Sequence, residues 1–116
     1  MFIRITLGAA VATFLALPAS ADAPADCRAA DLPNDTRLAA CVAATEAAAD
    51  PLARAEFLDY RGRLLRLQGE IDAAEPLILE ARRLAPEDPN PIASLGHILH
   101  DRGDFVGAQG LLDQAL

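Results

Sequence analysis

After its first 21 residues, the chain carries apolar residues at helical spacing with polar residues between them. One such segment follows the pair Asp50-Pro51 and is closed by Gly69. Aspartate caps helix starts, proline suits the first helical position, and glycine suits the residue after a helix end. The pattern predicts a helix from residue 51 to about residue 68, and a second helix over Ile71–Leu84.

The same plan of two helices around a Gly-Asp turn is repeated nearer the C-terminus. There the pattern predicts helices over Pro91–Asp101 and Phe105–Leu116. Upstream, apolar and alanine positions over Thr36–Ala49 predict another helix, capped by Asn34 or Asp35. The fold class expected from these periodicities is all-α.

The first residues have the features of a secretory signal peptide. A short basic start is followed by the apolar run Ile5–Leu17, then Pro18 and the small residues Ala19-Ser20-Ala21. The alternative is a membrane helix, but this run is too short to cross roughly 30 Å of hydrocarbon comfortably. We therefore expect residues 1–21 to be cleaved after Ala21, and the mature protein to be periplasmic or secreted, with no membrane contact.

The mature part is one small, acidic domain of about 95 residues. All 17 acidic residues of the chain lie in it, and its positive charges are arginines, because the chain has no lysine. Nucleic acids and anionic membranes attract basic surfaces. The composition therefore argues against both as partners.

Cys27 and Cys41 are the only cysteines. In an exported chain a disulfide is the expected state of such a pair. The alternative is a redox or metal pair, but a separation of fourteen residues matches no common metal or thioredoxin-like spacing. We expect the two cysteines to form a structural disulfide.

The chain matches itself when it is shifted by thirty-four residues. The positions that carry the match are small or apolar at helical spacing: Gly62, Leu65, Gly69, Ala74, Ile78, Ala81 and Pro86, then Gly96, Leu99, Gly103, Ala108, Leu112 and Ala115. In period, helix pairing and small residues, this part of the chain resembles the tetratricopeptide repeat family. Arg61 departs from the family pattern, which usually has an aliphatic residue where the second unit has Leu95.

The resemblance implies a solenoid of antiparallel helix-turn-helix units. Residues 55–88 would be the first unit and residues 89–116 the second, which lacks a C-terminal cap. Residues 22–54 would be a leader followed by a degenerate half-unit helix. Exported bacterial members often begin with a cysteine segment and an alanine-rich helix, which Ala39-Ala40-Cys41 resembles. On that interpretation Cys27 ties the leader to this helix and covers the end of the stack.

In this family the first helix of each unit lines a concave groove. The matching inward positions here are Glu56, Asp59, Arg63, Arg66, Asn90, Ala93, His97, His100 and Asp101. Arginine presents a fixed fork of donors that suits a carboxylate. The resemblance therefore implies a peptide groove in which Arg63 and Arg66 meet acidic or C-terminal groups. The alternative is a charged face that only contacts solvent.

His97 and His100 share a helix face, with Asp101 beside the second. A structural metal site needs four protein ligands, and zincins space their histidines four apart around a glutamate. Neither condition is met, so we predict no metal site and no cofactor. The sequence also carries no hydrolase elbow, phosphate loop or paired cysteine nucleophile, so no catalytic residue is predicted.

The leading hypothesis is a binding module for a protein or peptide partner. A second is a structural or assembly element, a subunit or fragment of a larger repeat scaffold with no groove ligand. A third is a metal or pH sensor that uses His97 and His100. The last predicted helix also presents more apolar residues than its partner helix covers: Phe105, Val106, Leu111, Leu112 and Leu116. We expect it to mediate self-association, or a cap to be missing.

Overall fold

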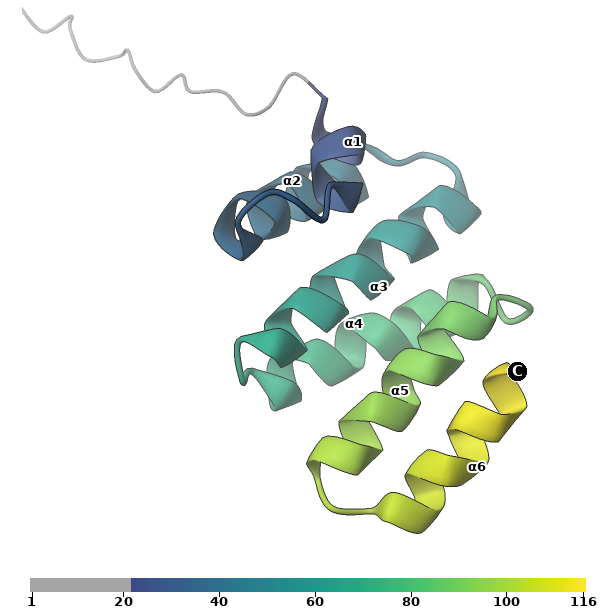
Figure 1. Ribbon diagram of the computed structural model, residues 1–116. Coiled ribbons are helices and arrows are strands. Elements are labelled where there is room, and N and C mark those ends of the chain that lie inside the picture. The colour runs from purple at the N-terminus through teal and green to yellow at the C-terminus, as the bar shows by residue number, and fades with distance from the viewer. Residues whose placement is uncertain (1–21) are drawn as a thin grey trace, which may run out of the picture.

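The computed structural model describes residues 22–116, which form six helices and no strand. In chain order these are α1 (Ala23–Arg28), α2 (Asn34–Ala47), α3 (Pro51–Leu67), α4 (Ile71–Leu84), α5 (Pro89–Asp101) and α6 (Phe105–Ala115). The predicted all-α class is confirmed, and α3, α4 and α6 match their predicted ranges to within one residue. The predicted signal peptide lies outside the described residues. Figure 1 shows the helices following one another from α1 to α6.

Aspartate followed by proline begins two of these helices. The Asp50 carboxylate accepts a hydrogen bond from the Ala53 N–H at 3.1 Å, and Asp88 accepts one from Asn90 at 2.9 Å. The start predicted for α5 was therefore two residues late, because Pro89 rather than Pro91 occupies the first helical turn after the cap. The short helix α1 was not predicted, although it too has an aspartate cap, Asp22, and a proline, Pro24, in its first turn.

The predicted cap of α2 was wrong. Pro33 occupies the cap position, and no side chain caps this helix. The proline ring fixes φ of Pro33 at −57°, and the Pro33 carbonyl accepts the first hydrogen bond of the helix, from the Arg37 N–H at 3.0 Å. The helix therefore runs over Asn34–Ala47, two residues earlier at each end than predicted.

The turns between α3 and α4 and between α5 and α6 each depend on a glycine in the left-handed region. Gly69 has φ 84° and Gly103 has φ 86°. After each glycine, the next N–H donates back to a carbonyl five residues earlier, Glu70 to Leu65 and Asp104 to Leu99, both at 2.9 Å. This bond closes a helix end and favours glycine at the turn. The two turns, thirty-four residues apart, have the same geometry.

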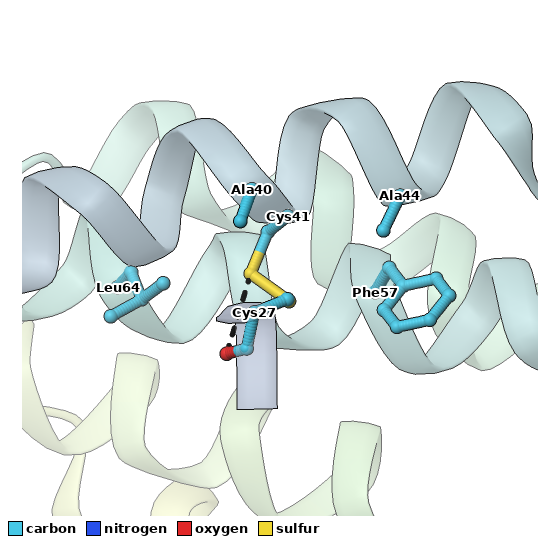
Figure 2. Packing of buried hydrophobic residues seen from close by; sticks show 6 residues of the cluster. All are labelled: Cys27, Ala40, Cys41, Ala44, Phe57 and Leu64. Carbon is cyan, nitrogen blue, oxygen red and sulfur yellow. Dashed lines mark hydrogen bonds between the residues drawn. A yellow bond between two sulfur atoms is a disulfide. The ribbon is translucent and has the colours of Figure 1, made fainter. Parts of the chain in front are cut away.

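The first packing cluster surrounds the disulfide that joins α1 to α2. Cys27 and Cys41 are bonded, as predicted, and both are fully buried. Figure 2 shows the cluster that they form with residues of α2 and α3. Its members are Cys27, Ala40, Cys41, Ala44, Phe57 and Leu64. The disulfide thus replaces apolar burial that a six-residue helix could not supply alone.

Two further clusters join the later helices in sequence. The first lies between α3 and α4 and comprises Ala55, Leu58, Ala81 and Ala85. The second joins α4 to α5 and comprises Ala74, Ile78, Leu95 and Ile98, with Leu111 of α6 beside it. Each helix therefore packs mainly against its chain neighbours, as expected of a helical-repeat-like arrangement.

Candidate functional site

A cleft lined mainly by polar residues lies between α3 and α5. It has a volume of about 360 Å³. The residues that line it come from both helices: Arg63, Arg66 and Leu67 from α3, and Asn90, Ala93, Ser94 and His97 from α5. Five residues predicted to face a groove, Arg63, Arg66, Asn90, Ala93 and His97, are thus brought together here.

Arg63 is the cation whose donors are least engaged in this cleft. Its nearest carboxylate oxygen is Asp59 Oδ2 at 3.7 Å, which is too long for a hydrogen bond. The guanidinium lies 5.1 Å from the centre of the Tyr60 ring, and half of the side chain is exposed. Arg63 therefore presents a fixed fork of donors to the cleft.

Arg66 is already paired across the two helices. Its Nη1 donates to Asp101 Oδ2 at 2.8 Å, and both side chains are about three-quarters buried. The pair joins the end of α3 to the end of α5 and neutralises much of the charge of Arg66. Asp101 is thus a partner of Arg66 and does not line the cleft.

The two predicted groove histidines separate in the structure. His97 is exposed and lines the cleft. His100 packs edge-on against Phe105, with ring centres 5.0 Å apart, and is not among the lining residues. Its Nδ1 lies 4.0 Å from Asp101 Oδ1. Within residues 22–116, no three His, Cys, Asp or Glu side chains gather as a metal site would require.

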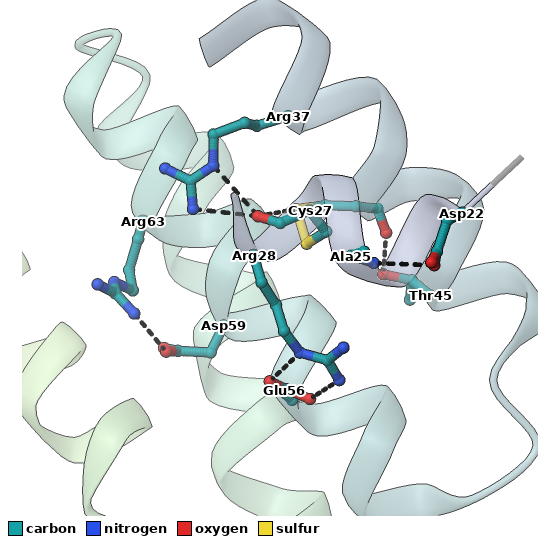
Figure 3. The surroundings of a disulfide bond; sticks show 10 residues. Asp22, Ala25, Cys27, Arg28, Arg37, Thr45, Glu56, Asp59 and Arg63 are labelled. Atoms are coloured by element: carbon teal, nitrogen blue, oxygen red, sulfur yellow. Dashed lines mark hydrogen bonds and ion pairs between the residues drawn. A yellow bond between two sulfur atoms is a disulfide. The ribbon is translucent and has the colours of Figure 1, made fainter. Parts of the chain in front are cut away.

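A second, smaller cavity of about 60 Å³ adjoins the cleft and shares Arg63 and Asn90 with it. Its walls are rich in carboxylates and comprise Glu56, Asp59, Tyr60, Arg63, Asp88 and Asn90. The Glu56 carboxylate is held by both arms of Arg28, at 2.8 and 2.7 Å, as Figure 3 shows. This hydrogen-bonded ion pair lowers the pKa of Glu56, so that carboxylate stays charged.

Asp59 differs from the other carboxylates of this cavity because it is buried. Its side chain is 5% exposed, and Oδ1 has no hydrogen-bond partner. Burial raises the pKa of Asp59, although Ser94 and Arg63 oppose that rise. Because folding raises this pKa, the contribution of Asp59 to stability is full below its unfolded-state pKa. It is lost as the pH rises through the folded-state pKa.

Four wall residues of the two cavities were not predicted. Tyr60, Leu67 and Ser94 each lie four positions after a predicted groove residue, on the same helix face. Helical spacing alone could therefore have found them. Asp88 precedes α5, and its position follows from the aspartate cap that the sequence interpretation missed.

Comparisons with known proteins do not assign a family. No family model matches the chain, and no match was found among curated proteins or among solved structures. Fold and site together define an all-helical, helical-repeat-like protein with one disulfide and a polar cleft. The disulfide indicates an oxidising, extracytoplasmic environment. None of the helices within residues 22–116 has the length and apolarity needed to cross a membrane.

Proposed function

We propose that this chain is a binding module of the tetratricopeptide kind, which takes a peptide or protein partner in the bacterial periplasm. Two helix pairs with equivalent glycine turns, thirty-four residues apart, support the repeat assignment. The buried disulfide and the predicted signal peptide support export. Binding is proposed rather than catalysis because the sequence lacks the spacings of catalytic nucleophiles.

The observation that carries the proposal is Arg63 in the cleft between α3 and α5. The guanidinium has five N–H donors and no acceptor, and the nearest carboxylate lies beyond hydrogen-bond distance. A ligand carboxylate could accept two of these donors side by side. Arg66 and His97 lie on the same walls and add donors beside it. We therefore propose that the cleft binds acidic or C-terminal carboxylates of a peptide.

Replacing Arg63 with glutamine is expected to weaken peptide binding about tenfold or more, because a hydrogen bond to a charged group contributes roughly 1.5–3 kcal/mol. The probe is a mixed-sequence hexapeptide library, in matched forms with a free or an amidated C-terminus. Peptides retained by immobilised mature protein would be identified by mass spectrometry, and their affinities measured by calorimetry.

Arg83→Gln is the matched control, since Arg83 pairs locally with Glu80 on the exposed face of α4. Free-carboxylate and acidic peptides should be retained by wild type and by the control, but not by Arg63→Gln. The proposed function would be contradicted if retention of a peptide depended neither on its terminal carboxylate or acidic side chains nor on Arg63.

A second candidate function, self-association through α6, is favoured by the surface of that helix. Phe105 is 62% exposed and Val106 is 87% exposed. Between the two helix pairs, Arg102 binds Asp72 at 2.7 Å and Glu75 at 2.6 Å. The positions thirty-four residues after these acids are Val106 and Gln109, so α6 lacks the charges used at the internal interface.

The occupant that we propose for this face is a second copy of the chain. The protein has a net charge of −7, so most faces of two copies repel one another. Asp113 is the one charged residue within α6. Two α6 helices that meet around a two-fold axis, as in a symmetric dimer, therefore bring one acid from each copy and no other charged side chain of the helix.

Val106→Asp is expected to weaken this self-association about tenfold or more, because an unpaired charge would be buried between two apolar faces. The substitution places at residue 106 the acid found at the equivalent Asp72, in the first turn of a helix, where acids are favourable. Sedimentation velocity over a dilution series measures the effect. Leu52→Asp is the control, since Leu52 is an exposed residue in the first turn of α3. A wild-type monomer at every concentration would end this candidate.

A further inference from the structure

One oxygen of the buried Asp59 carboxylate has no hydrogen-bond partner. Asp59 lies on α3, and its Oδ1 accepts no hydrogen bond. Figure 3 shows its side chain pointing toward that of Arg63, but the two groups remain 3.7 Å apart. A buried carboxylate oxygen without a hydrogen bond destabilises a fold, and such atoms in folded proteins usually have a functional or structural reason.

The other carboxylates of the small cavity are already bound. Glu56 accepts both arms of Arg28, and Asp88 caps α5 by accepting the Asn90 N–H. A ligand can therefore bind Asp59 without displacing Arg28 from Glu56 and without removing the cap of α5. Asp59 lines the cavity, and because the terminal torsion of a carboxylate is soft, its oxygens can turn toward a ligand there.

The cavity has room and charge for a small cation. Its volume of about 60 Å³ exceeds the roughly 10–15 Å³ that one water molecule needs, and three of its six wall residues are carboxylates. An ammonium group is compact and has three donors, whereas a guanidinium is a larger planar group. A bound metal ion is not favoured, since no cluster of three ligating side chains occurs within residues 22–116.

We propose that Asp59 anchors a primary ammonium group of the ligand, from a peptide N-terminus or a lysine side chain. The two cavities share Arg63 and Asn90, so an ammonium at Asp59 and a carboxylate at Arg63 are bound side by side. The ligand is then a peptide segment with a positive and a negative group close together. This inference rests on the proposed function and adds the ammonium site to it.

The test uses a mixed-sequence tripeptide library in four matched forms. These forms have both termini free, an acetylated N-terminus, an amidated C-terminus, or an acetylated N-terminus with lysine at one position. Affinity capture on mature protein, with mass spectrometry of the retained peptides, ranks them. Asp59→Asn is the variant, and Asp31→Asn, in the exposed loop between α1 and α2, is the matched control.

Acetylation is expected to weaken binding to the wild type about tenfold or more, and lysine is expected to restore it if the side chain is the source of the ammonium. Asp59→Asn should remove this preference, whereas Asp31→Asn should keep it. If acetylation has no effect but C-terminal amidation weakens binding, the ammonium site is overturned and the proposed function stands. If no form is retained, both fail.

The Asp59→Asn variant is expected to fold, because the change removes a buried charge and keeps the shape of the side chain. Its thermal midpoint at pH 7 should equal or exceed that of wild type, as checked by circular dichroism. A purely structural role would give the opposite pattern, with lower stability and an unchanged preference for ammonium. That pattern would overturn the inference.

Discussion

Loss of the Cys27–Cys41 disulfide is expected to lower the free energy of unfolding by about 3 kcal/mol. The bridge closes a loop with a sequence separation of 14, and it restricts the unfolded chain as well as joining α1 to α2. Urea unfolding of mature protein, followed by far-ultraviolet circular dichroism with and without reductant, measures the difference.

Loss of the disulfide is also expected to disrupt the contacts that α1 makes with α2 and α3. Arg28 of α1 binds Glu56 of α3, and Arg37 of α2 donates to the Cys27 carbonyl at 3.2 and 3.0 Å. If α1 detaches, both contacts are lost, and Glu56 is left beside Asp59 without its counter-ion.

The Cys27→Ala, Cys41→Ala double variant separates the cross-link from side-chain packing. It should be about as unstable as the reduced wild type and should not respond to reductant. Equal unfolding curves for oxidised and reduced wild type would show that the apolar cluster alone holds α1, contrary to this expectation.

Helices α3, α4 and α6 were predictable because local signals mark their ends. Asp50-Pro51, Gly69 and Gly103 act through backbone geometry within a few residues, so the sequence is enough. The start of α5 was misplaced although Asp88-Pro89 carries the same signal as Asp50-Pro51. The second proline, Pro91, lies inside the first turn of α5 and does not mark its start.

The residues of the groove face were predictable in outline, but the pairing and burial of its charged side chains were not. The resemblance to tetratricopeptide repeats implied that Arg63 and His97 face a groove, and both residues line the cleft. The pairing of Arg66 with Asp101, and the burial of Asp59, depend on how closely α5 approaches α3. That distance is set by packing between residues far apart in the sequence, which no local pattern reports.

Gly62→Ala is expected to lower the free energy of unfolding by about 1–2 kcal/mol, because an added methyl group has no room between α3 and α4. A Cβ at Gly62 would lie 2.7 Å from Ile78 Cδ1 and 3.1 Å from the Ala74 carbonyl oxygen. Ile78 is fully buried, so it cannot move aside without displacing its neighbours. Overpacking of about 1–3 kcal/mol then outweighs the gain of up to about 1 kcal/mol in helix propensity.

Two other glycines provide matched controls for Gly62→Ala. Gly96 is the equivalent residue of the second unit, and a Cβ there would lie 2.9 Å from Leu112 Cγ, a half-buried side chain that can move. At Gly110 of α6 a Cβ would meet nothing within 4 Å, so alanine should stabilise the protein by up to about 1 kcal/mol. Urea unfolding should therefore rank the proteins Gly110→Ala, wild type, Gly96→Ala and Gly62→Ala, from most to least stable. Gly62→Ala as stable as Gly110→Ala would show that the two helices of the first unit are not in such close contact. The glycine match between the two units would then lose its physical basis, since it rests on close helix approach at both positions.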